Sequence, residues 1–129
     1  MARTRRRGDE GLTSTELAVV MPVLIGLVLV PFQIALWWHA HQIADAAARE
    51  AVDAAQVAGA TEDDGIRAAD WFLDAAGNIT EPQVTVHRTA ETVSVEVTGR
   101  APRLLPGFDW QVTGRAAGPI ERFIPEPDR

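Results

Sequence analysis

An uncharged run from Leu17 to Trp38 constrains the fold of this chain more than any other feature, and Gln33 is the only polar residue in it. As a helix with ~1.5 Å rise per residue, this run would extend about 33 Å. The hydrocarbon core of a bilayer is roughly 30 Å thick, so the run is long enough to cross it once with slight tilt. Because lipid offers the backbone no hydrogen bonds, we expect a transmembrane helix, bent at Pro22 and Pro31.

Basic residues are placed unevenly around this run. Four arginines precede it, namely Arg3, Arg5, Arg6 and Arg7. No arginine follows the run until Arg49, so the positive-inside rule places the N-terminus in the cytoplasm and everything after Trp38 outside the cytoplasmic membrane. The formal net charge of the whole chain is −6. We expect no nucleic-acid partner, because nucleic-acid binding requires a basic face.

The outer end of the run carries Trp37 and Trp38, which predict an aromatic belt at the membrane interface. His39 and His41 follow, and we interpret them as residues at headgroup level, with metal binding by the pair as the weaker alternative. A cleaved secretory signal is a competing interpretation of the run. Its apolar region is normally about 7–15 residues long and ends at a small-x-small site. This run is longer and ends in bulky residues, so we expect it to remain in the mature protein.

Glu16 stands at the threshold of the run, where a carboxylate is costly unless a positive group compensates it. Gly11 lies five residues earlier. Cleavage between Gly11 and Leu12 would give Leu12 a free ammonium group one helical turn before Glu16. The carboxylate could then face that ammonium group, or the one of a neighbouring subunit. The same cut would remove every basic residue that precedes the run.

The segment around Gly11 resembles a known processing site. Residues 7–11 are RGDEG and residues 12–17 are LTSTEL, which is similar to a type III prepilin cleavage site: a basic leader ends in glycine, and glutamate is the fifth mature residue. Residues 17–24 (LAVVMPVL) and 46–51 (AAAREA) are similar to the apolar start and the alanine-rich segment of TadE-like proteins. From Arg7 to Val57, the chain therefore resembles the TadE-like minor pilins or pseudopilins of Flp-type, tight-adherence pili.

This resemblance implies a single-pass protein of the cytoplasmic membrane that a membrane prepilin peptidase cleaves after Gly11. It implies that the apolar helix packs with other pilin and pseudopilin subunits and with the pilus assembly machinery, and that Glu16 sets their register by charge pairing. After assembly, the protein would reach the pilus or the cell surface. The residues leave one alternative open, an uncleaved single-pass anchor that carries an extracytoplasmic binding or sensor module.

Outside the membrane, the chain is predicted to continue the same helix. Residues 39–57 are rich in alanine, which is a strong helix former. Small residues gather near one face of this helix: Ile43, Ala47, Ala51 and Ala54, with Ala44, Ala48 and Ala55 beside them. Such a face permits close packing against another helix. The competing interpretation is that the alanines reflect only genome composition.

A second helix is predicted after Gly59. Thr61 is a suitable N-cap, and the acidic residues 62–64 (EDD) suit the first turn of a helix. A calcium loop is the less favoured interpretation of this acidic run, because the run lacks alternating oxygen ligands. Helical spacing continues to Ala76, and Gly77 with Asn78 is predicted to end the helix in a left-handed cap.

Three strands are predicted beyond this helix. Alternating valines favour strands around residues 84–87 and 93–97, joined as a hairpin by residues 89–91. A third strand is predicted from Asp109 to Ala117, with Trp110 and Val112 on one face.

Together these elements predict an α+β fold: a long N-terminal transmembrane helix that continues outside the membrane, a short second helix and a small three-stranded antiparallel sheet. We divide the chain into a basic leader (1–11), the long helix (12–58, with the span at 17–38), a small extracytoplasmic domain (59–122) and a disordered tail (123–129). The chain has no cysteine, and it contains no nucleotide-binding or hydrolase motif. We therefore expect neither an enzyme nor a metal or other cofactor.

Overall fold

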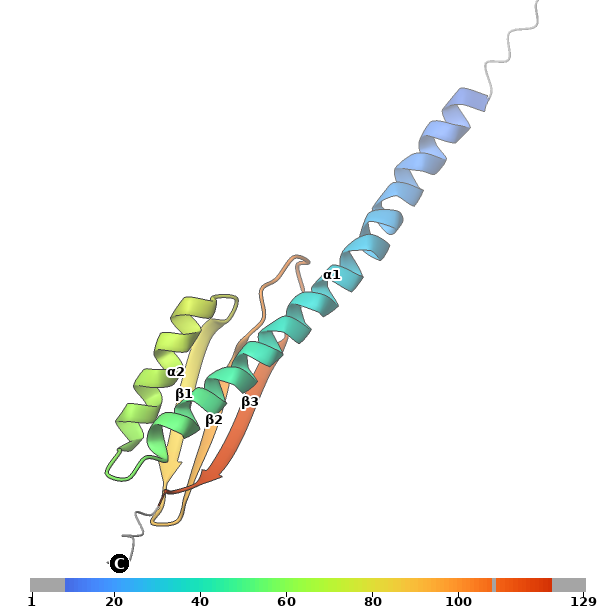
Figure 1. The fold of residues 1–129 in the computed structure, drawn as a ribbon. Helices are drawn as coiled ribbons and strands as arrows, with labels where there is room; N and C mark the ends of the chain where they lie inside the picture. Colours follow the sequence, from blue (N-terminus) through green and yellow to red (C-terminus); the bar gives the residue numbers. More distant parts are fainter. Residues whose placement is uncertain (1–8, 108, 122–129) are drawn as a thin grey trace, which may run out of the picture.

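The computed structural model describes residues 9–107 and 109–121, with side chains from Ser14 onward. Its elements are, in chain order, α1 (Asp9–Ala55), α2 (Glu62–Ala76), β1 (Thr80–Arg88), β2 (Thr92–Arg100) and β3 (Gln111–Pro119). The strands form one antiparallel sheet in the order β1-β2-β3, and both helices cover the same face of it (Figure 1). The predicted α+β fold is therefore confirmed. The leader arginines and the tail 123–129 lie outside the described residues.

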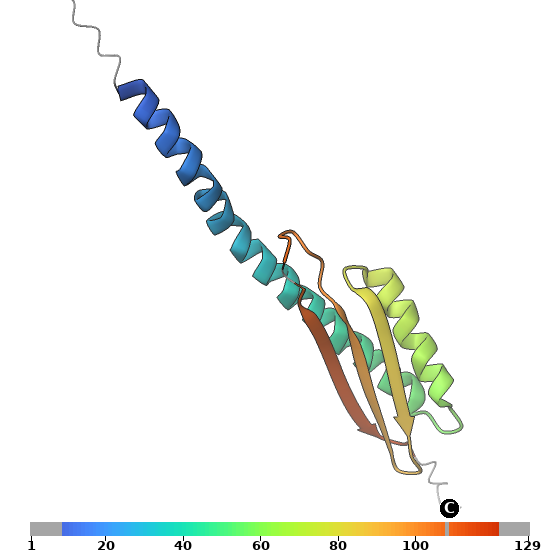
Figure 2. The same ribbon diagram turned by 180° about the vertical axis from the view of Figure 1, so that it is seen from behind.

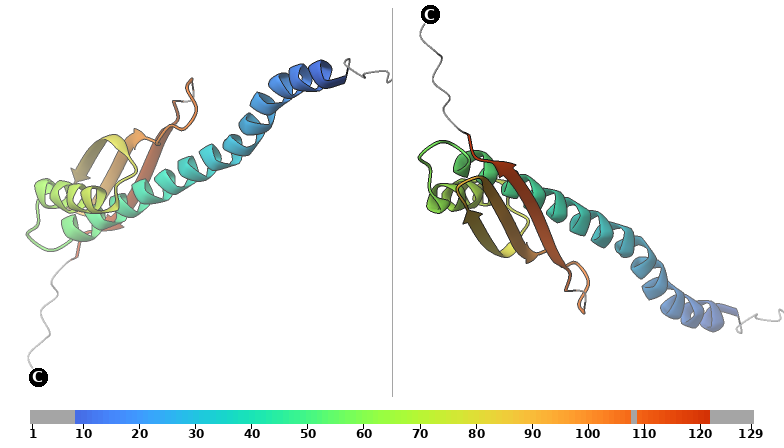
Figure 3. Two further views of the ribbon diagram at one scale, coloured as in Figure 1. Left: turned by 90° about the horizontal axis from the view of Figure 1, so that it is seen from above. Right: turned by 90° about the horizontal axis from the view of Figure 1, so that it is seen from below.

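Helix α1 has two halves with different surroundings. Its N-terminal half projects away from the rest of the molecule, and its C-terminal half lies along the sheet beside α2 (Figure 2). The helix bends within the projecting half, which contains Pro22 and Pro31 (Figure 3). It begins at Asp9, three residues before the predicted start.

The alanine-rich half of α1 forms the centre of the hydrophobic core. Ala44, Ala47 and Ala51 are fully buried, as are three further alanines, Ala40, Ala48 and Ala55. The face packs mainly against the chain's own sheet and against α2. Of the residues predicted for this face, Ala54 alone is only half-buried. The small side chains matter because they let the sheet and α2 approach the backbone of α1.

The closest approach is between α1 and β3. A β-carbon added at Gly114 would overlap the carbonyl group of Ala44 and the backbone nitrogen of Asp45. A second approach joins the two helices, since a β-carbon at Gly65 of α2 would lie 2.9 Å from the carbonyl oxygen of Ala51. Glycine at both positions is therefore required by space rather than by backbone conformation.

Helix α2 begins with the predicted cap. The Thr61 side chain accepts a hydrogen bond from the Asp64 N–H, and the Asp64 carboxylate accepts one from the Thr61 N–H, at 2.8 Å. The hydrogen bonds from the backbone and the side chain of Thr61, followed by that from Arg67, lower the pKa of Asp64 below its ordinary value. The acidic run is thus a capped helix start, as predicted. At the other end, Gly77 has a positive φ of 61°, but its ψ of −163° is not that of a left-handed helical cap.

The sheet supplies the other side of the core through alternating valines. The inward-facing valines are Val86, Val93, Val95, Val97 and Val112. Strands β1 and β2 form the predicted hairpin. Strand β3 begins two residues later than predicted, at Gln111, because Trp110 belongs to the preceding loop, where it packs on α1. Contacts with α1 extend along β3, from Gln111, which accepts from Trp37, to Gly118, which lies against Val52.

Replacing Gly114 by alanine should destabilise the domain by about 1–3 kcal/mol or more, because the added methyl group meets rigid backbone. Thermal unfolding of the full chain in detergent, followed by near-ultraviolet circular dichroism, would measure this change. Gly26→Ala is the matched control, since nothing lies within 4 Å of a β-carbon at Gly26. Equal midpoints for the two variants would contradict the close packing of β3 on α1.

Candidate membrane and assembly site

The projecting half of α1 is apolar and largely uncovered. From Ser14 to Phe32, every side chain is exposed or half-buried, with Leu27 at 69% and Phe32 at 60% exposed. Among the described residues, α1 is the one helix long and apolar enough to cross a membrane. Leaving this apolar surface in contact with water would be costly, whereas a bilayer covers it without that cost. The helix is therefore suited to membrane anchoring.

The predicted processing residues lie at the beginning of α1. The backbone is helical through Gly11 and Leu12. Glu16 is exposed, and no cationic group of the described part of the chain lies within 4.0 Å of its carboxylate. The charge partner proposed from the sequence, an ammonium group on Leu12, would arise only after cleavage. The roles of these three residues stay predictions.

Gln33 marks the point where the two halves of α1 meet. It is the only buried polar side chain among the described residues, at 2% exposure. Its Nε2 donates to the Pro102 carbonyl oxygen at 3.1 Å, and its Oε1 accepts from the Leu104 N–H at 2.9 Å. Both partners lie in the loop between β2 and β3, about 70 positions away in sequence. Gln33 thus fastens that loop to the side of the helix.

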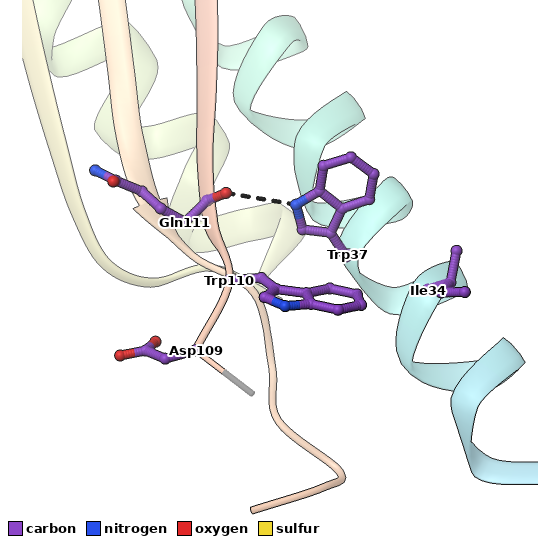
Figure 4. A pocket seen from close by; sticks show the side chains of 5 residues that line it. All are labelled: Ile34, Trp37, Asp109, Trp110 and Gln111. Carbon is purple, nitrogen blue, oxygen red and sulfur yellow. Dashed lines mark hydrogen bonds between the residues drawn. The ribbon is translucent and has the colours of Figure 1, made fainter. Parts of the chain in front are cut away.

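One turn further along α1, Trp37 continues this contact. Its ring meets Trp110 edge to face, with ring centroids 6.0 Å apart at an interplanar angle of 82°. Its Nε1 donates to the Gln111 carbonyl oxygen at 3.4 Å. These residues line an open apolar groove of about 410 Å³ together with Ile34 and Asp109 (Figure 4). The groove lies between α1 and the start of β3.

The other predicted interface residues follow Trp37 on the helix. Trp38 is 59% exposed, and His39 is exposed beside it. His41 stacks on Trp37, with ring centroids 6.0 Å apart, and its Nε2 lies 3.9 Å from an Asp45 carboxylate oxygen. The two tryptophans therefore differ, since Trp37 joins the domain to the helix and Trp38 faces outward. Within the described residues, no three His, Asp or Glu side chains are grouped as a metal site would require.

The base of the β2–β3 loop is held by charge pairs. Arg100 lies 3.3 Å from the carboxylate of Asp109 and 3.6 Å from that of Glu81. These pairs are exposed, so each contributes little to stability alone. They nevertheless join the two ends of the loop to the bulge in β1, where Glu81 has a positive φ of 52°. The loop is thus fastened at its base by Arg100 and at its tip by Gln33.

The sequence showed Gln33 only as the one polar residue of the apolar run, and it gave no indication of the loop residues that Gln33 contacts.

Replacing Gln33 by leucine should leave the Pro102 carbonyl and the Leu104 N–H unpaired, at a cost of about 1–3 kcal/mol. Amide hydrogen exchange of the full chain should then be faster at Leu104. Gln42→Leu, on the exposed side of the same helix, is the matched control. Unchanged exchange at Leu104 in the Gln33 variant would show that the two hydrogen bonds do not hold the loop.

Comparison with known proteins identifies a family for the region that contains this apolar helix. The model of the family described as TadE-like protein matches residues 11–53, which is most of α1. No curated protein and no solved structure matches the chain. The matched region includes both the exposed apolar half of α1 and most of the buried alanine face. The resemblance found in the sequence is thereby confirmed, and the N-terminal region of this chain is TadE-like.

Proposed function

We propose that this protein is a TadE-like minor pilin or pseudopilin, anchored in the cytoplasmic membrane by α1, that supports assembly of an Flp/Tad-type pilus. One observation carries the proposal. The family match begins at Gly11 and extends over the apolar half of α1, and that half is left uncovered by the rest of the chain. A helix that is apolar on all sides requires lipid or other apolar helices around it.

The arginines ahead of α1 give the proposed orientation. With the leader in the cytoplasm, the sheet and α2 lie outside the cytoplasmic membrane. The basic residues support this direction, since four arginines precede the apolar run and the next one is Arg49. The domain is then available to neighbouring subunits on the outer side of the membrane.

Processing by a prepilin peptidase after Gly11 is the next step of the proposal. The bond between Gly11 and Leu12 lies in the first turn of α1. A terminal turn can fray to expose the bond, and fraying breaks only the hydrogen bonds that the carbonyl groups of this turn accept from the next one. The new ammonium group on Leu12 would lie about 6 Å along the helix axis from Glu16.

Assembly would then exchange lipid for protein around the projecting half of α1. The apolar helices of pilin and pseudopilin subunits would pack together and transfer this surface from one apolar environment to another. Such a transfer has little hydrophobic driving force, so polar contacts at the helix ends contribute a larger share of the association energy between subunits. Glu16 is the one carboxylate placed to make such a contact, with its own ammonium group or a neighbour's. We assign the protein a structural role and no catalytic one.

Replacing Glu16 by alanine should leave membrane insertion intact and impair piliation, because insertion depends on the apolar run and register depends on the charge. Membrane fractionation and electron microscopy of pili in a strain that carries the variant would measure both. Glu50→Ala removes an exposed carboxylate from the outer half of α1 and is the matched control. Normal piliation with Glu16→Ala would contradict the assembly role and favour a simple membrane-anchored module.

A further inference from the structure

We propose that the tip of the β2–β3 loop, residues 102–107, binds the lipid headgroup region of the outer membrane surface and, through Gln33, fixes the depth of α1 in the bilayer. This inference rests on the anchoring of α1 proposed above. It adds a second lipid contact, made by the folded domain itself, which lies about 70 residues beyond the transmembrane helix in sequence.

The uncovered part of α1 is shorter than the hydrocarbon core of a bilayer. Leu17 to Phe32 extends only about 24 Å, which is roughly 6 Å less than the hydrocarbon core. About four further residues, through Leu36, are needed to complete the span. These residues lie at the level of the loop, because Gln33 bonds to it and Trp37 packs against Trp110 at its end. A bilayer that matches the apolar length of α1 therefore reaches the loop.

The loop lies at the end of the domain that faces the membrane-spanning half of α1. It leaves the sheet at the end that faces the projecting half of α1 and runs beside the helix in that direction (Figures 1 and 2). In the perpendicular view, the loop lies on the same side of α1 as the sheet and points away from the helix axis (Figure 3). The opposite end of the domain carries the β1–β2 hairpin and the connection from α1 to α2. Only the end with the loop can touch the membrane that α1 crosses.

The tip of the loop combines exposed apolar side chains with few free backbone donors. Leu104 is 51% exposed, and Leu105 and Pro106 follow it. Backbone donors are few, because Pro102 and Pro106 have no N–H and the Leu104 N–H is bonded to Gln33. Unpaired backbone groups are the main cost of placing a loop in an apolar environment. The two prolines and the Leu104 bond therefore lower part of that cost.

Arg103 supplies the polar part of the same contact. Its side chain is exposed, and it is in no ion pair with a carboxylate among the described residues, whereas Arg100 is paired on two sides. An unpaired guanidinium beside exposed leucine suits the phosphate layer, with its aliphatic stem against acyl chains. The groove formed by Trp37 and Trp110 lies next to the tip and offers the apolar and polar surface typical of interface tryptophans.

Depth measurement on the full chain tests the proposal. The chain has no cysteine, so single nitroxide labels can be placed by Leu104→Cys, Val28→Cys and Val57→Cys. Leu104 and Val57 are similarly exposed, at 51% and 48%, but lie at opposite ends of the domain, and Val28 lies within the predicted span. In bilayers of phosphatidylethanolamine and phosphatidylglycerol, relaxation by oxygen and by a nickel chelate would report lipid and water contact, respectively.

We expect the ratio of oxygen relaxation to nickel-chelate relaxation at Leu104 to lie clearly above that at Val57 and below that at Val28, as for a label between the headgroups and the acyl chains. A Leu104 label that behaves like Val57, while Val28 stays in lipid, would overturn this inference and leave the anchoring of α1 intact. A Val28 label in water would overturn both. A Leu104 label shielded from both reagents would indicate a protein neighbour and would also overturn the proposal.

The role of Gln33 is tested in the same system. Adding Gln33→Leu to the Leu104 label should increase its relaxation by the nickel chelate severalfold, because the tip is no longer fastened to the helix. Gln42→Leu should leave it unchanged. Equal relaxation in the two backgrounds would show that Gln33 does not position the loop.

Discussion

The contact between Gly114 and the backbone of Ala44 and Asp45 is the constraint on which the rest of the structure depends. It brings β3 against α1 more closely than any side chain would allow, and the neighbouring alanines let the sheet and α2 settle on the same helix. Because α1 is continuous from Asp9 to Ala55, the domain is joined to the apolar half without a flexible connection. The position of the sheet relative to the apolar half of α1 is then determined by one continuous helix.

One helix consequently meets two different environments. From Leu17 to Phe32 it is apolar on all sides and exposed or half-buried, which suits lipid or a bundle of similar helices. From Ile34 to Trp38 the helix is still apolar, with Ile34 48% and Trp38 59% exposed, and from Ala40 onward its apolar face is buried against the sheet and α2. Gln33 lies where this change begins, and its amide pairs with the Pro102 carbonyl and the Leu104 N–H of the β2–β3 loop.

The sequence predicted those features that depend on local patterns. The long helix, the Thr61 cap and the hairpin after Arg88 each follow from neighbouring residues, and the family resemblance rested on a contiguous segment. The pairing of Gln33 with Pro102 and of Trp37 with Trp110 joins residues about 70 positions apart, so no local spacing indicates it. The alanine face was predicted, but its principal partner was not, because small side chains suit a glycine on a strand as well as another helix.

In the proposed function, cleavage releases the TadE-like apolar helix from its basic leader, and the helix then anchors a pilus-associated domain. Mass spectrometry of the mature N-terminus, on protein purified from native membranes, tests it most directly. We predict a mature chain that begins at Leu12, with the four leader arginines removed and Glu16 as the fifth residue. A mature chain that begins at Met1 or Ala2 would contradict it, because Glu16 would then have no ammonium partner and the helix would be a plain anchor.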